Sequence, residues 1–171
     1  VQQDGEQRAG ALVYRLPAGA ERGGQIRGGP AGAYLTDCQG YLQGRGQLGA
    51  EDRLLAMLPI SHTAAYDAYY TSSVDPATGL PGYTVTQAGV QTLTVSADNP
   101  LVLFNLDVAL EWDASKDTNY LTQLQYDLNR TSELLYDWSG GQAALGRIRI
   151  FHDARRQPQV DGFQPWLNGH I

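Results

Sequence analysis

The sequence contains a single cysteine, Cys38, among its 171 residues. One cysteine excludes an internal disulfide, so stability has to come from core packing or from association with other molecules. We expect Cys38 to be a small buried apolar residue, because free cysteine is among the most buried residue types.

Long apolar runs and basic charge are also scarce. The longest apolar stretches, residues 54–60 and 101–106, are far shorter than the roughly 20 residues that a membrane-spanning helix requires. The formal net charge is -6, so the summed field repels nucleic-acid phosphates. We therefore expect no membrane-spanning segment and no nucleic-acid partner.

Catalytic motifs are missing as well. The sequence has no H-E-x-x-H, no G-x-S-x-G and no phosphate-binding glycine loop with its lysine. The histidines are His62, His152 and His170, which lie far apart in the sequence. A metal site joining His62 and His152 with Asp153 or Asp107 is a weaker interpretation than hydrogen bonding at strand ends. We expect no catalytic residue, no cofactor and no metal in this chain.

Short alternating segments between glycine, proline and asparagine turns dominate the first two thirds of the chain. They predict antiparallel strands over residues 11–16, 31–37, 41–47, 53–59, 66–72, 82–85, 91–96 and 101–112. Eight short strands in about a hundred residues are typical of a β-sandwich. The abundance of Gly, Tyr, Gln, Thr and Ser fits a secreted or cell-surface protein.

A helical period replaces the alternation after Trp112. One predicted helical face contains Leu121, Leu124, Leu128, Leu135 and Trp138. Ser115 or Asp117 can accept hydrogen bonds from the first helical amides, and Gly140 and Gly141 can end the helix. The alternation resumes over residues 144–151, so we expect a strand, a crossover helix and a parallel strand.

The fold class predicted from these patterns is mainly β with an α/β extension, in two domains. The first domain, residues 1–101, is an antiparallel sandwich with an ordered N-terminal tail over residues 1–10. The second domain, residues 102–171, is one strand-helix-strand unit followed by an irregular C-terminal tail. A single such unit does not bury both faces of its sheet, so the sandwich or a partner has to complete it.

Two groups of acidic residues are candidate sites. Asp113, Ser115 and Asp117 alternate like calcium ligands, but the sixth position lacks glycine and the twelfth lacks glutamate, so helix capping is the better interpretation. Asp107 and Glu111 are spaced to share one face of a strand, where paired carboxylates can serve acid-base chemistry. Without a nearby nucleophile, a solvated strand face is the better interpretation.

The segment 32–41, GAYLTDCQGY, with Gly49 and residues 53–56, resembles the transthyretin-like or carboxypeptidase-regulatory sandwich, in which a hairpin of similar pattern precedes a glycine and a strand. Residues 103–110, 132–142 and 148–151 are similar to the opening of secreted metzincin-like metallopeptidase domains. That resemblance implies a strand, a long helix, an L-Y-D-x-x-x-G-Q turn and a second strand. It also implies a zinc-binding H-E-x-x-H, which would have to lie beyond Ile171.

We expect a non-catalytic extracellular structural or binding module that acts within a larger surface assembly or polypeptide. The alternatives are the amino-terminal fragment of a secreted zinc metallopeptidase and a subunit of a filament assembled by β-strand addition. The expected partner is another protein or further copies of the chain. The candidate binding surface comprises Tyr66, Tyr69, Tyr70 and Tyr83. The candidate assembly strand carries Leu12, Tyr14 and Leu16.

Overall fold

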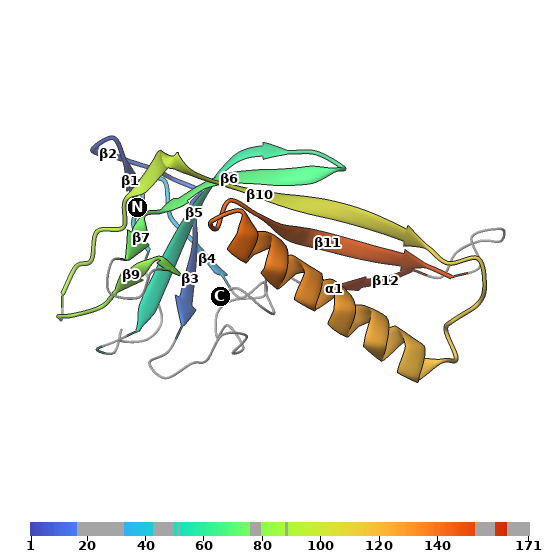
Figure 1. Ribbon diagram of the computed structural model, residues 1–171. Helices are drawn as coiled ribbons and strands as arrows, with labels where there is room; N and C mark the ends of the chain where they lie inside the picture. The colour runs from blue at the N-terminus through green and yellow to red at the C-terminus, as the bar shows by residue number, and fades with distance from the viewer. Residues whose placement is uncertain are drawn as a thin grey trace.

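The computed structural model describes residues 1–16, 33–42, 50, 52–75, 80–87, 89–152 and 160–163. These residues form one helix and twelve strands (Figure 1). In chain order the elements are β1 (Gln2–Gln3), β2 (Glu6–Gln7), β3 (Leu12–Leu16), β4 (Ala33–Leu35), β5 (Arg53–His62), β6 (Tyr66–Ser72), β7 (Val74–Asp75), β8 (Leu80–Pro81), β9 (Tyr83–Thr84), β10 (Val95–Ala109), α1 (Thr118–Trp138), β11 (Ala143–Phe151) and β12 (Val160–Phe163).

One eight-stranded sheet organises the described part of the chain. Its strand order is β12-β11-β10-β6-β5-β3-β4, and β9 pairs separately with β5. Every pair is antiparallel except β10 with β11, which are parallel and joined through α1. The class predicted from the sequence, mainly β with an α/β extension, is confirmed. The sandwich type stays a prediction, since these strands form one continuous sheet.

Strand β10 connects the two ends of this sheet. It pairs with β6 over its first part and with β11 from Val102 to Ala109. The sequence predicted two strands here, over residues 91–96 and 101–112, and this was wrong. The chain passes through Asn99 and Pro100 with a shift in register rather than a turn. The predicted domain boundary at residues 101 and 102 therefore falls within β10.

Strand β5 shows how the sheet fills a core on each side. Leu55 and Met57 pack in a cluster with Tyr14, Leu101, Leu103, Ala144 and the helical residue Tyr136. The alternate residues Leu54 and Ala56 pack in a second cluster with Val13, Val85, Leu93 and Val95. Because successive side chains of a strand point to opposite faces, β5 separates two hydrophobic clusters. We call the side of the first cluster the helix face and the opposite side the outer face.

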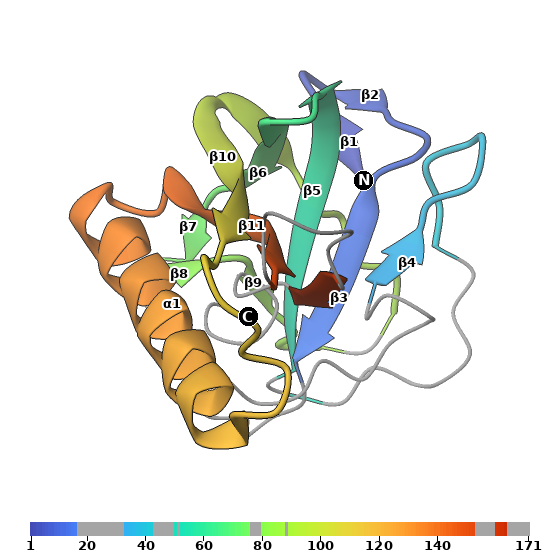
Figure 2. The same ribbon diagram turned by 90° about the vertical axis from the view of Figure 1, so that its right-hand side faces the viewer.

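Helix α1 lies against one face of β10 and β11, away from β3 and β4 (Figure 2). Its leucines at 121, 124, 128 and 135 pack against Leu110, Leu145, Ile148 and Ile150. Asp117 is the N-cap and accepts a hydrogen bond from the Tyr120 amide at 3.0 Å. Gly140 and Gly141 follow the helix with positive φ angles. The predicted helix and both of its end signals are confirmed.

Trp138 does not belong to the buried side of α1, contrary to the prediction. Its side chain is 82% exposed, whereas Ser132 and Tyr136 are buried. Trp138 is the last residue of the helix. The buried Ser132 hydroxyl accepts a hydrogen bond from the Leu145 amide at 3.0 Å, which ties the helix to β11.

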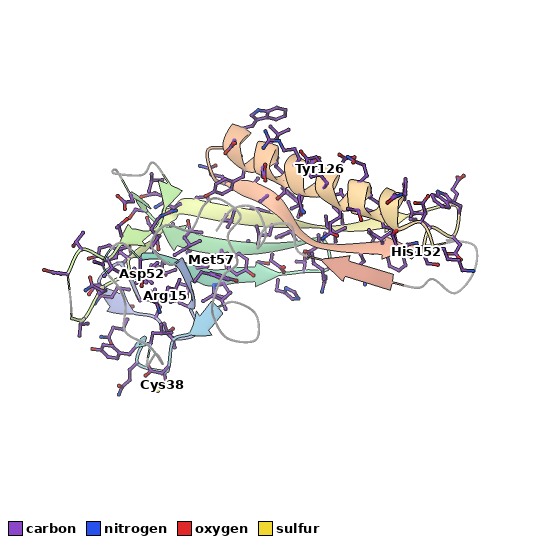
Figure 3. The ribbon with its side chains drawn as sticks, turned by 90° about the horizontal axis from the view of Figure 1, so that it is seen from below. Arg15, Cys38, Asp52, Met57, Tyr126 and His152 are labelled. Carbon is purple, nitrogen blue, oxygen red and sulfur yellow. The ribbon has the colours of Figure 1, made fainter. Side chains whose placement is uncertain are left out.

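The N-terminal tail is held by the chain itself. β1 and β2 form a small hairpin, and the Gln2 amide donates to the Leu93 carbonyl at 2.8 Å. The Val1 ammonium donates to the Gly40 carbonyl at 2.6 Å. Arg15 on β3 forms an ion pair with the buried Asp52 at 2.6 Å (Figure 3).

The structure changes two further predictions. Residues 160–163, placed in an irregular tail, form β12, which pairs with β11. The strand predicted over 31–37 is reduced to β4, and most of the strand predicted over 41–47 lies outside the described residues. Among the described residues, no helix combines the length and apolar character needed to cross a bilayer.

Candidate interaction surface

The outer face of β10 and β11 carries polar and aromatic side chains where the helix face carries aliphatic ones. Leu106, Val108, Ile148 and Ile150 point toward α1. Their neighbours along the strands, Asp107, Arg147 and Arg149, therefore point the other way. The β10–β11 register places Asp107 directly opposite Arg149 and Ala109 opposite Phe151. On this side of β11, and of β10 from Val102 onward, the described residues include no helix and form no buried hydrophobic cluster.

Arg149 organises this face through two of its neighbours. Its Nε and Nη2 atoms donate to the two carboxylate oxygens of Asp107 at 2.7 and 2.6 Å. Its guanidinium carbon also lies 5.5 Å from the centroid of the Phe151 ring, which is a cation–π geometry. The fork of the guanidinium matches the carboxylate, so both side chains are held in fixed orientations.

The pair changes the acidity of both groups. Hydrogen bonding from Arg149 holds the pKa of the Asp107 carboxyl below its ordinary value. The same hydrogen bond raises the pKa of Arg149 above its ordinary value. Both side chains remain about half exposed, so solvent screens their attraction and the pair fixes geometry more than it adds stability. Asp107 therefore does not sit in an acid-base pair with Glu111; its partner is a cation.

Two aromatic residues extend this face toward β6. Phe104 on β10 is paired in register with Tyr66 on β6, and their side chains are 43% and 37% exposed. Both are large apolar groups that the fold leaves in contact with solvent. We define the outer patch as Tyr66, Phe104, Asp107, Arg147, Arg149 and Phe151.

A bulge beside Phe104 shapes the middle of the outer patch. The β10–β11 register shifts between Phe104 and Leu106. At this bulge a side chain accepts the hydrogen bond that a backbone carbonyl accepts elsewhere in the sheet. The Oδ1 atom of Asn105 accepts from the Arg147 amide at 2.8 Å. Gly146 is required at this point, because a Cβ atom would lie 2.7 Å from that same oxygen. Bulges of this kind re-aim neighbouring side chains, here Phe104 and Arg147.

The four tyrosines predicted to form a binding surface are divided between the two faces. Tyr69 packs against the helix-face cluster, whereas Tyr70 and Tyr83 pack against the outer-face cluster. The Tyr83 hydroxyl donates to Gln91 Oε1 at 2.7 Å. Only Tyr66 belongs to the outer patch. The structure thus does not bring these four rings together in one surface, and their role in binding stays a prediction.

The predicted assembly strand is an inner strand of the sheet. β3 pairs with β4 on one side, through Leu12, Val13 and Tyr14, and with β5 on the other. Tyr14 is buried in the helix-face cluster and Leu12 packs against it. Leu16 also pairs with Arg53. Because both edges of β3 carry hydrogen bonds within the chain, strand addition by a neighbour would have to displace β4 or β5.

The histidines do not form a site within the described residues. His62, at the end of β5, pairs with Asp67 at the start of β6. His152 is buried just after β11, and Asp153 lies outside the described residues. No group of three His, Cys, Asp or Glu side chains in the described part of the chain could hold a metal ion.

The acidic loop before α1 caps the helix. Asp113 Oδ1 accepts from the Ser115 amide at 3.0 Å and from its hydroxyl at 2.5 Å. These hydrogen bonds lower the pKa of Asp113. Asp117 caps α1, as the capping interpretation predicted.

Cys38 is exposed, so the prediction that it is buried was wrong (Figure 3). It lies in a tight turn in which Asp37 Oδ1 accepts from the amides of Gln39 and Tyr41, both at 2.9 Å. The side chain of the turn residue consequently points to solvent rather than into the core.

The sequence interpretation missed Phe104, Arg147 and Arg149 as surface residues. A usable signal was present, because Arg147 and Arg149 alternate with Ile148 and Ile150 and so share a strand face. The pairing of Arg149 with Asp107 could not be read from that pattern, since 42 residues separate the two.

Comparisons with known proteins give no relative. No protein-family model matches the chain, and neither a curated protein nor a solved structure is similar to it at a significant level.

Proposed function

We propose that the chain is a non-catalytic extracellular structural or binding module that acts within a larger surface assembly. The observation that carries this proposal is the outer patch, a continuous sheet face with exposed aromatic and arginine side chains. Aromatic residues and arginine are enriched at protein interfaces and supply most of their binding hot spots.

The outer patch is also held in a fixed shape before any partner arrives. Its side chains project from the paired strands β6, β10 and β11, and Asp107 with Phe151 fixes the position of Arg149. A partner therefore has to immobilise few side chains on binding, which lowers the entropic cost of association. Sheet faces of this kind suit a protein partner better than a small molecule, because they offer area rather than a cavity.

A photo-crosslinking experiment tests the proposal in cells that carry the encoding gene. Benzoylphenylalanine in place of Phe104 should give a discrete crosslinked product on irradiation. Val90 provides the matched control, because it is apolar and 87% exposed but lies outside the outer patch. Protease added to intact cells should digest the same product. Equal products from positions 104 and 90, no product at 104, or protection from the protease would contradict the proposal.

A second candidate function is the opening part of a secreted zinc metallopeptidase. It is supported by the parallel arrangement of β10 and β11 around α1, which is the strand-helix-strand order that the resemblance implies. The test is to read the encoding gene beyond the codon for Ile171. An in-frame H-E-x-x-H would support this function, and a stop codon at that point would exclude it.

A further inference from the structure

Helix α1 has its own exposed side, opposite to the outer patch. The aliphatic side of the helix packs on β10 and β11, and Tyr126 and Trp138 remain 63% and 82% exposed. Figure 3 shows Tyr126 on the helix and Met57 among the strands of the sheet. We define the helix patch as Tyr126, Asp127, Arg130, Glu133, Asp137 and Trp138. The helix and the sheet thus pack together as two layers. Aromatic residues are exposed on the outer side of each layer, on the helix patch and on the outer patch.

The two patches differ in the sign of their charge. The helix patch holds three carboxylates and one guanidinium, and that guanidinium, on Arg130, is paired with Glu133. The carboxylate of Asp127 accepts its hydrogen bond from the neutral amide of Gln123 at 2.8 Å. The outer patch holds two guanidinium groups and one carboxylate, and Arg149 is paired with that carboxylate on Asp107. Arg147 is left as the excess positive charge.

We infer that the helix patch of one copy of this chain docks on the outer patch of a second copy. This inference rests on the proposed function and names the chain itself as the partner. Opposite charge on the two surfaces steers such a contact and fixes its orientation, while the exposed aromatic rings on both sides provide the apolar area. Because each copy has a net charge of -6, two copies repel each other in most orientations. The opposite charges of the helix patch and the outer patch therefore decide which faces meet.

Helix α1 and strand β11, which carry parts of the two patches, have similar lengths. A helix of 21 residues is about 30 Å long. Strand β11, with nine residues, also spans about 30 Å. Because the patches lie on opposite sides of these two layers, the contact is heterologous, and each docked copy presents a further helix patch. Such a contact generates a ring or an open filament rather than a closed dimer.

Charge reversal on each patch tests this inference with the purified chain. The sheet variant, Arg147→Glu, makes both patches negative. The helix variant, Asp127→Lys with Asp137→Lys, makes both patches positive. Each variant alone should raise the concentration at half assembly at least about tenfold in sedimentation velocity experiments. An equimolar mixture should restore assembly, because each patch then meets a patch of opposite sign on the other variant.

The control variant, Glu6→Lys with Asp98→Lys, makes the same change in net charge as the helix variant, but outside both patches. Both of these residues are exposed. It should assemble like the original chain. Circular dichroism of every variant checks that a loss of assembly is not a loss of folding.

Three results would overturn the inference: an original chain that stays monomeric or stops at a dimer, variants that assemble unchanged, or a mixture that does not assemble. A dimer alone would indicate an isologous contact, in which both copies use the same surface. A monomeric chain that still crosslinks from position 104 to a different protein removes only this inference. Absence of any product at position 104 removes the proposed function itself.

Discussion

The two ends of the sheet differ in how their faces are covered. At the β3–β5–β6 end, one hydrophobic cluster packs on each face, and the residues of β5 are buried alternately on both sides. At the β10–β11 end, α1 covers one face and the opposite face carries the outer patch. Burial of apolar area stabilises the first end, and the second end keeps exposed side chains that stability alone does not require.

Truncation of Met57 should show the largest effect on stability. Its side chain is 1% exposed at the doubly covered end, so Met57→Ala leaves a cavity and should lower the free energy of unfolding by about 2–5 kcal/mol. Met57→Leu preserves the volume and should lower it by less than about 1.5 kcal/mol. Urea unfolding followed by circular dichroism measures both variants. Equal losses for the two would show that this end is not tightly packed.

Tyr14 should make the same end sensitive to alkaline pH. Burial, with a smaller contribution from Tyr69, raises the pKa of Tyr14 to about 12. Its pKa in the unfolded chain is about 10, so the folded state binds the phenolic proton more tightly. The associated stability is complete below pH 10 and is lost as the pH rises toward 12, with a total of roughly 2–3 kcal/mol.

Unfolding in urea at several pH values between 9 and 11.5 measures this loss. Tyr14→Phe has no titrating hydroxyl and should lose less stability over the same range. The remaining loss in that variant includes Tyr69, whose pKa burial also raises. A variant that loses as much stability as the original chain would show that Tyr14 does not carry the effect.

Phe104 should show the smallest effect on stability. Because its ring is already partly solvated, Phe104→Ser removes little buried area beyond its cross-strand contact with Tyr66. We expect a loss of less than about 1 kcal/mol in urea unfolding. The same substitution should weaken assembly in sedimentation experiments. A loss as large as that of Met57→Ala would instead indicate that Phe104 belongs to the core.

Local features of this fold were predictable from the sequence, because their causes are local. The leucine spacing, the Asp117 cap and the glycines at 140 and 141 act within a few residues, and α1 lies where they predict. Strand β6 likewise has the predicted bounds, Tyr66–Ser72. The continuation of β10 through Pro100 was not predictable in this way. Thr71 on β6 donates to the Asn99 carbonyl at 3.1 Å, and that contact depends on the folded sheet.

The candidate surface was less predictable than the fold. The tyrosines chosen from their clustering in the sequence alternate across the sheet, so the pleat sends Tyr69 to one face and Tyr70 to the other. The outer patch combines residues from β6, β10 and β11 and therefore exists only after distant strands have paired. Cys38 is exposed because it lies in a tight turn. Trp138 is exposed at the last residue of α1. The periodicity of the sequence did not indicate either exposure.

The parallel pairing of β10 with β11 also sets an order of events during synthesis. β6 precedes β10 in the chain, so β10 can pair with it as soon as both have been made. Arg149 on β11, the partner of Asp107 on β10, is made 42 residues after Asp107. At ordinary translation rates this interval lasts roughly 2–8 s, far longer than hairpin formation. During that time one edge of β10 lacks its β11 partner and can pair with a neighbouring nascent chain. Hydrogen-exchange labelling of stalled ribosome complexes should find that the β10 amides that pair with β11 become protected only after β11 has left the exit tunnel.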